Sequence, residues 1–133
     1  MGGKLKLLIV DDEPLSRERI CSFRLKGCCF EIAGEAEDGR EALEKIDRIH
    51  PDIVVTDIVM PVMGGLDLLK EIRKRPNPPK VVILTCHEDF EKAQTALRFG
   101  AQDYIVKLML RENDFKESIQ KIADIIFRER RGR

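Results

Sequence analysis

Acidic side chains follow two apolar segments of this chain directly. The first segment, residues 5–10, ends on Asp11 and Asp12, and the second, residues 53–56, ends on Asp57. Neighbouring carboxylates repel one another, so such a group needs a cation or hydrogen-bond donors beside it. Mg²⁺ prefers oxygen ligands and typically takes one or two carboxylates, several waters and phosphate oxygens. Asp12 and Asp57 are therefore the predicted direct ligands of a magnesium ion.

Two further apolar segments end on side chains that suit a phosphoryl group. Residues 81–84 precede Thr85, and residues 103–106 precede Lys107. A hydroxyl can donate a hydrogen bond to a phosphoryl oxygen, and an ammonium can neutralise its charge. With a metal to screen two approaching anions, Asp57 is the predicted nucleophile of an aspartyl phosphate. The alternative is structural, because Asp is also common after strands and at the positive ends of helices.

The elements that position these side chains alternate between strand and helix. We expect strands at residues 5–10, 28–34, 53–57, 81–84 and 103–106, each followed by a helix. The helices are expected at about 15–26, from a capping box at 38–41 to about 50, from 66 to before Pro76, from 90 to before Gly100, and from 111–114 to about 128. On the first helix we place Ile20 and Phe23 inward, and Arg17, Glu18 and Arg19 outward.

This alternation predicts a doubly wound α/β fold, in which crossover helices cover both faces of a five-stranded parallel sheet. In such a sheet the carboxyl ends of the strands share one edge, where ligands bind. The four polar strand ends are therefore expected to converge.

The composition limits the classes of function. The 133 residues include 24 Lys and Arg and 24 Asp and Glu, so no net charge draws the chain to nucleic acid or to a membrane surface. The four cysteines form no C-x-x-C pair, which indicates neither a zinc site nor a disulfide framework and fits a reducing cytoplasm. No apolar run approaches the roughly 18 residues of a membrane span. We expect a single domain over 1–133, with a core at about 5–127 and a basic tail or linker start at 128–133.

Taken together, these residues resemble the receiver domain of two-component response regulators. The similarity runs from Lys6 to about Phe127, and it is carried by Ile9-Val10-Asp11-Asp12-Glu13, Asp57-x-x-Met60-Pro61-x-Met63-x-Gly65, Thr85 and Tyr104-x-x-Lys107. The resemblance implies a flavodoxin-like sheet with strand order 2-1-3-4-5.

The resemblance also implies a metal site and a phosphoacceptor. Asp57 matches the residue that a histidine kinase phosphorylates, and Mg²⁺ is the implied cofactor. Asp12, Asp57 and the main-chain carbonyl of Val59 match the metal ligands, with Asp11 as a supporting acid.

Three further matches imply a switch. Thr85 and Lys107 match the pair that contacts the phosphoryl oxygens, and Tyr104 matches the aromatic residue whose rotamer follows Thr85. The new charge then biases a bistable surface that a partner or output domain reads.

The implied partners are a sensor histidine kinase or phosphotransfer protein and a C-terminal DNA-binding output domain, so that the process regulated is transcription. A homodimer on phosphorylation is also implied, whereas direct contact of this domain with nucleic acid or membrane is not. The implied chemistry is not that of an enzyme beyond self-catalysed transfer to Asp57 and autodephosphorylation, and the implied location is cytoplasmic.

The chain departs from the family pattern near the site. Leu108 follows Lys107 where the family usually has a proline in a cis peptide, so we expect a trans bond here. Cys86 stands where a smaller residue is commoner and is expected to narrow access. Val59 and His87 occupy the two variable positions beside the site.

Three other functions compete with a phosphorylated switch. A degenerate receiver would bind partners without phosphorylation. A hydrolase or transferase with an aspartyl-phosphate intermediate usually needs an acid two residues after the nucleophile, where this chain has Val59. A dinucleotide-binding module would need a G-x-G-x-x-G motif after the first strand, which the sequence lacks.

Overall fold

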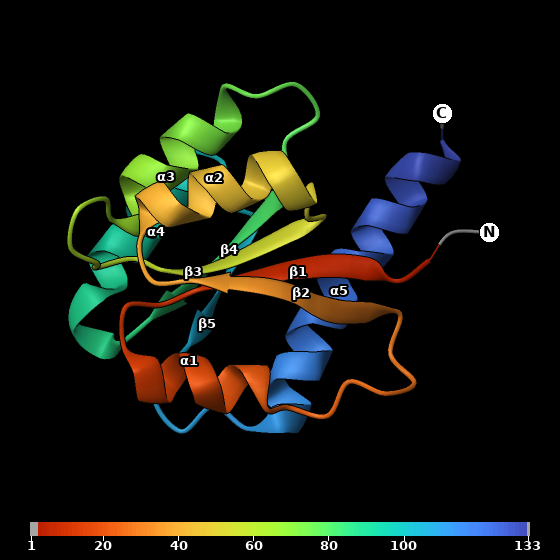
Figure 1. The fold of residues 1–133 in the computed structure, drawn as a ribbon, viewed down its shortest axis with the longest axis horizontal. Coiled ribbons are helices and arrows are strands. Elements are labelled where there is room, and N and C mark those ends of the chain that lie inside the picture. Colours follow the sequence, from red (N-terminus) through yellow and green to blue (C-terminus); the bar gives the residue numbers. More distant parts are fainter. Residues whose placement is uncertain (1–2, 133) are drawn as a thin grey trace.

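The chain forms a five-stranded parallel sheet with helices on both faces (Figure 1). The computed structural model describes residues 3–132. The strand order β2-β1-β3-β4-β5 confirms the predicted doubly wound, flavodoxin-like α/β architecture. The strands are β1 (Leu5–Val10), β2 (Phe30–Ala36), β3 (Ile53–Asp57), β4 (Lys80–Thr85) and β5 (Asp103–Val106). The helices are α1 (Pro14–Cys21), α2 (Gly39–Ile49), α3 (Gly65–Arg73), α4 (Phe90–Arg98) and α5 (Glu112–Arg131), with a short 3₁₀ turn, η1 (His87–Asp89), before α4.

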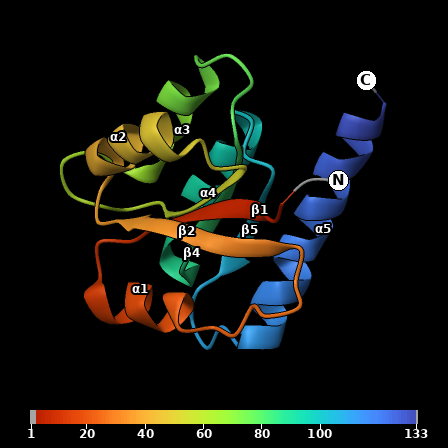
Figure 2. The same ribbon diagram turned by 45° about the vertical axis from the view of Figure 1, so that its right-hand side comes forward.

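Two apolar cores lie on opposite faces of the sheet. Helices α1 and α5 cover one face, and α2, α3 and α4 cover the other (Figures 1 and 2). Along β3, Ile53 and Val55 belong to the first core, whereas Val54 belongs to the second. A strand that is buried on both faces has no exposed positions, which is why this segment is apolar without alternation.

The first helix is shorter than predicted. It ends at Cys21 instead of near Lys26. The Ser22 hydroxyl donates to the Arg19 carbonyl at 2.7 Å, and the amide of Arg24 donates to the Glu112 carboxylate at 2.6 Å. The segment after α1 is therefore bound to the start of α5 and does not continue the helix.

The second strand begins later than predicted. Phe30 starts β2 opposite Leu5, the first residue of β1, and Ala36 ends it opposite Val10. The bounds of β2 thus follow those of its partner strand, which leaves Cys28 and Cys29 in the preceding loop.

The remaining helices are close to their predictions. Asp38 caps α2 by accepting a hydrogen bond from the Glu41 amide at 2.9 Å, and the helix ends at Ile49 with His50 in a left-handed conformation. One face of α5 is buried as expected, through Phe115, Ile119, Ile122, Ala123 and Ile126. The helix continues to Arg131, so most of the basic segment at 128–133 is helical. Of the helices in residues 3–132, none combines the length and the apolar character that a membrane crossing requires.

The connection from β5 to α5 follows a path of its own. The peptide bond between Lys107 and Leu108 is trans, as predicted. Met109 takes a positive φ of 59°, and both Leu108 and Met109 are exposed. The loop therefore presents two large apolar side chains to solvent beside Lys107.

Candidate functional site

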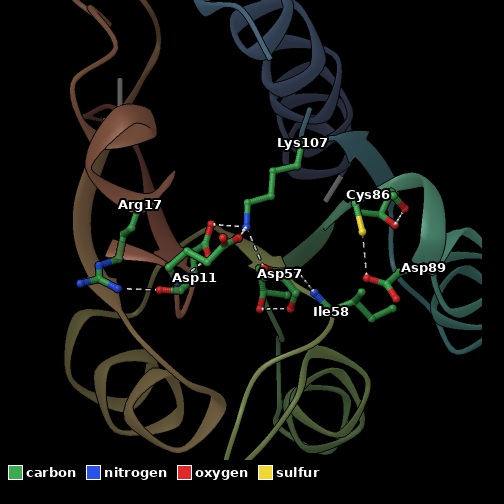
Figure 3. A network of polar contacts seen from close by, with 10 residues as sticks. Asp11, Arg17, Asp57, Ile58, Cys86, Asp89 and Lys107 are labelled. Atoms are coloured by element: carbon green, nitrogen blue, oxygen red, sulfur yellow. Dashed lines mark hydrogen bonds and ion pairs between the residues drawn. The ribbon is translucent and has the colours of Figure 1, made fainter. Parts of the chain in front are cut away.

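Four strands end at the same edge of the sheet, and Figure 3 shows Asp11, Asp57 and Lys107 close together there. Asp11 directly follows β1, Asp57 ends β3, Thr85 ends β4 and Lys107 directly follows β5. A cleft of about 340 Å³ opens at this edge; its lining is Asp12, Glu13, Asp57, Val59, Cys86, Asp89 and Lys107.

The ammonium of Lys107 lies among three carboxylates. Its Nζ atom is 2.9 Å from Oδ2 of Asp57, 2.9 Å from Oδ2 of Asp11 and 3.1 Å from Oδ1 of Asp11. It also donates to the carboxylate of Glu13. Burial lowers the pKa of Lys107, but the hydrogen bonds that its ammonium donates to Glu13, Asp57 and Asp11 outweigh burial and raise the pKa above its ordinary value. Lys107 therefore stays charged at neutral pH.

Asp57 is held from two sides. Its Oδ1 accepts a hydrogen bond from the Ile58 amide at 2.8 Å, while Oδ2 faces Lys107. The residue is 8% exposed, and this burial raises the pKa of Asp57 even though Lys107 acts in the opposite direction. The turn after β3 needs a glycine, because a Cβ atom at Gly65 would lie 2.4 Å from the Asp57 carbonyl oxygen. Gly65 thus allows the chain to pass close to the main chain of Asp57.

The acids fit a hard divalent cation. Carboxylate oxygens of Asp11, Asp12 and Asp57 lie within 4.8 Å of one another. Oδ2 of Asp11 is buried and accepts no properly directed hydrogen bond from residues 3–132, although Lys107 is close to it. Buried carboxylates are costly unless cations balance their charge, and here the one ammonium of Lys107 is shared among three acids; Mg²⁺ takes such oxygen ligands. Val59 lines the same cleft and is half exposed.

Thr85 and Tyr104 lie near this group without touching its charges. The Thr85 hydroxyl donates to the carbonyl of Cys86 at 3.0 Å. Tyr104 is half buried and packs edge-on against Phe90, with ring centroids 5.7 Å apart. Both side chains therefore contact the β4–α4 region, Thr85 beside the cleft and Tyr104 on the α4 side.

Cys86 contacts an acid at the rim of the cleft. Its thiol donates to the Asp89 carboxylate at 3.0 Å, and this hydrogen bond raises the pKa of Cys86 (Figure 3). The thiol is thus less acidic than an ordinary cysteine. The narrower access that we expect from Cys86 stays a prediction.

Sequence reasoning missed two residues of the network. Glu13 contacts Lys107, and the only signal was its place directly after the two aspartates. Arg17 was predicted to point outward, and this was wrong: its guanidinium donates to the carbonyl of Asp11 at 2.6 Å. Helix α1 carries two arginines on different sides, so the spacing of polar residues could not tell which of them turns toward the sheet.

Comparison with known proteins decides the family. The sequence profile of the response regulator receiver domain matches residues 7–120. The chain belongs to this receiver domain family. Receiver domains are phosphoacceptors that bind Mg²⁺ at an acidic pocket and interact with histidine kinases or phosphotransfer proteins.

Individual relatives agree with this assignment. The chain is 42% identical over 103 residues to a chemotaxis protein CheY of Listeria monocytogenes, covering 77% of this receiver domain and 86% of that protein. It is 40% identical over 121 residues to a positive alginate biosynthesis regulatory protein of Pseudomonas aeruginosa, covering 90% of this chain and 47% of that one. Among solved structures, the REC domain of the response regulator AraT from Geobacillus stearothermophilus superposes with a TM-score of 0.86 at 32% identity, covering 95% and 98% of the two chains. The receiver domain thus spans less than half the length of several curated relatives, from 29% to 47%.

Proposed function

We propose that Asp57 is the phosphoacceptor of this receiver domain, and that a sensor histidine kinase or phosphotransfer protein supplies the phosphoryl group. The observation that carries the proposal is the position of the Asp57 carboxylate, which lines the cleft together with Asp12 and Lys107. An oxygen of Asp57 forms the new bond to phosphorus while the bond from phosphorus to the donor nitrogen breaks. The donor imidazole keeps the electron pair of that bond and takes up a proton.

The residues that would hold Mg²⁺ are Asp12, Asp57 and the main-chain carbonyl of Val59, with Asp11 in support. When bound, the ion neutralises part of the negative charge as the phosphoryl group approaches the Asp57 carboxylate. Lys107 supplies a second positive charge at the same place. To contact a phosphoryl oxygen, its ammonium has to leave Oδ2 of Asp57, and Glu13 and Asp11 keep it near the cleft.

We further propose that Thr85 and Tyr104 transmit the change. The Thr85 hydroxyl would exchange the Cys86 carbonyl for a phosphoryl oxygen, and Tyr104 would then repack against α4. Tyr104 is the only tyrosine and the chain has no tryptophan, so its intrinsic fluorescence reports this residue alone. Phosphorylation is expected to change that signal in the wild type and to change it much less in a phosphorylated Thr85→Ala variant. An equal change in both would contradict the relay.

The receiver domain at 1–133 would control an output domain that follows residues 128–133, and we propose that this is a DNA-binding domain that regulates transcription in the cytoplasm. This proposal is supported by the length of the alginate regulatory relative, of which the receiver covers 47%. Phosphorylation would favour a homodimer. Apart from phosphorylation and dephosphorylation of Asp57, we propose no reaction for this chain.

The test is phosphorylation by a small donor. The protein is incubated with acetyl phosphate and Mg²⁺, and its intact mass is measured with and without a chelator. We expect one added phosphoryl group in the wild type, none with chelator and none in Asp57→Asn. Asp52→Asn is the matched control, because Asp52 lies at the opposite edge of the sheet, before β3, and its variant should react like the wild type.

Two results would favour another function. If the wild type gains no mass while it remains folded, the chain acts as an unphosphorylated interaction module. Continuous release of phosphate from a phosphate ester would indicate a hydrolase instead.

A further inference from the structure

Arg17 joins the ends of two strands beside the candidate site. Its Nη1 atom donates to the carbonyl oxygen of Asp11 at 2.6 Å (Figure 3). Its Nε atom donates to the carboxylate of Glu35 at 2.9 Å. Only 18% of the Arg17 side chain is exposed. The guanidinium thus links α1 to the segment that follows β1 and to β2.

Asp11 is fixed through its main chain as well as its side chain. Its amide donates to the Ala36 carbonyl at 3.0 Å, its carbonyl accepts from Arg17, and its Oδ1 accepts from the Glu13 amide at 3.0 Å. Asp11 is completely buried. Without Arg17, the buried carbonyl would lose a charged donor, and the peptide between Asp11 and Asp12 would be free to turn.

The other end of this link is also anchored. The carboxylate of Glu35 accepts from Arg17, and the main-chain carbonyl of Glu35 accepts from Lys45 on α2. A guanidinium has donors on several sides in a fixed plane, so it can serve both Asp11 and Glu35 at once. A lysine ammonium at the end of a flexible chain does not reproduce this geometry.

We propose that Arg17 is a positioning residue of the cation site. By fixing the main chain at Asp11, it keeps the carboxylates of Asp11 and Asp12 close to that of Asp57. Groups that orient metal ligands without touching the metal commonly change metal affinity about 10-fold to 100-fold when they are removed. The inference rests on the proposed function, because it assumes that these acids bind Mg²⁺.

Charge alone predicts the opposite effect. Arg17 is a cation next to an acidic cluster, and removing a positive charge makes the site more attractive to Mg²⁺. If Arg17 acted only through its charge, its loss would tighten Mg²⁺ binding. If it positions Asp11, its loss weakens binding. The sign of the change therefore separates the two roles.

The experiment measures the dissociation constant of Mg²⁺ by calorimetry for the wild type and four variants. We expect Arg17→Gln to bind Mg²⁺ about tenfold more weakly. Arg17→Lys, which keeps the charge, should also bind more weakly, and Glu35→Gln should show a smaller loss. Arg40→Gln is the matched control, since it removes the same charge from an exposed position on α2 and should leave the affinity unchanged.

Urea unfolding of the metal-free proteins shows that each variant is folded before titration. If Arg17→Gln does not fold, Arg17→Lys and Glu35→Gln decide the outcome. Equal or tighter binding in the folded Arg17 variants overturns the inference while the proposed function stands. If the wild type itself does not bind Mg²⁺, the proposed function fails and the inference fails with it.

Discussion

The two edges of the sheet both carry ion pairs, but they balance charge differently. At the edge where the strands end, the acids Asp11, Glu13 and Asp57 surround the single ammonium of Lys107. Two of these acids are almost fully buried. The acids that contact Lys107 therefore carry more negative charge than its ammonium neutralises.

At the opposite edge, Asp52 and Glu129 are each paired with a different cation. Asp52, just before β3, pairs with Arg130 at 2.5 Å, and Lys80 at the start of β4 pairs with Glu129 at 3.0 Å. The second oxygen of Asp52 accepts from the Lys6 amide at 2.8 Å. These contacts tie the last turns of α5, which run past the sheet in Figure 2, to the starts of β1, β3 and β4.

This difference in charge balance distinguishes the charged residues that stabilise the fold from those that bind a ligand. Balanced pairs in solvent fasten one element to another at little cost or gain. An excess of buried charge of one sign lowers the stability of the fold. Such an excess is expected where the charged groups bind a ligand, here a metal cation and a phosphoryl group. Three variants test this contrast in the metal-free protein.

The largest effect is expected at Lys107. Lys107→Ala removes the only cation that contacts the buried carboxylates of Asp11 and Asp57 in the described part of the chain. Leaving buried charges without a partner typically costs 3–5 kcal/mol, and access through the cleft reduces this to about 3 kcal/mol. Urea unfolding at pH 7 without Mg²⁺ measures the loss, and Mg²⁺ should restore part of it. If Lys107→Ala lowers the free energy of unfolding no more than Arg130→Ala does, the two edges of the sheet do not differ as described.

The Asp57→Asn variant is expected to change the free energy of unfolding by less than Lys107→Ala does, and to raise it. Burial raises the pKa of Asp57 above its ordinary value of 3.8, so the folded protein binds more protons than the unfolded chain between the two values. Stability then falls as pH rises through this interval, which means that ionised Asp57 opposes folding at neutral pH. Asp57→Asn should raise the urea midpoint at pH 7, and the gain should shrink as the pH falls toward 4. A gain that stays constant with pH would show that ionisation is not its cause.

The smallest effect is expected at Arg130. Its side chain is 51% exposed, and exposed ion pairs contribute about 0–1 kcal/mol. Arg130→Ala should therefore lower the free energy of unfolding by less than about 1 kcal/mol, and added salt should shrink the difference further. The comparison uses the same urea titration at low and high salt.

The parallel sheet and the convergence of the strand ends could be predicted because they depend on residue types in sequence. Strands such as β3 are apolar on both faces, and each one stops at a polar residue that the topology brings to one edge. The end of α1 could not be predicted, since it depends on the contact between Arg24 and Glu112, which are distant in sequence.

The directions of the side chains at the site could not be predicted from the sequence either. Arg17 turns inward because the Asp11 carbonyl and the Glu35 carboxylate lie on that side of α1, and both positions follow from tertiary packing. The direction of the Thr85 hydroxyl depends on a rotamer that several acceptors could stabilise. Motif spacing identifies such residues but does not show which contacts they make.

The most direct test of the account is to identify the phosphorylated residue. After reaction with acetyl phosphate and Mg²⁺, borohydride reduction converts an aspartyl phosphate into homoserine, which peptide mass spectrometry can locate. We expect homoserine at position 57 and unmodified aspartate at positions 11 and 12. Modification at Asp11 or Asp12, or at several acids without preference, would contradict it.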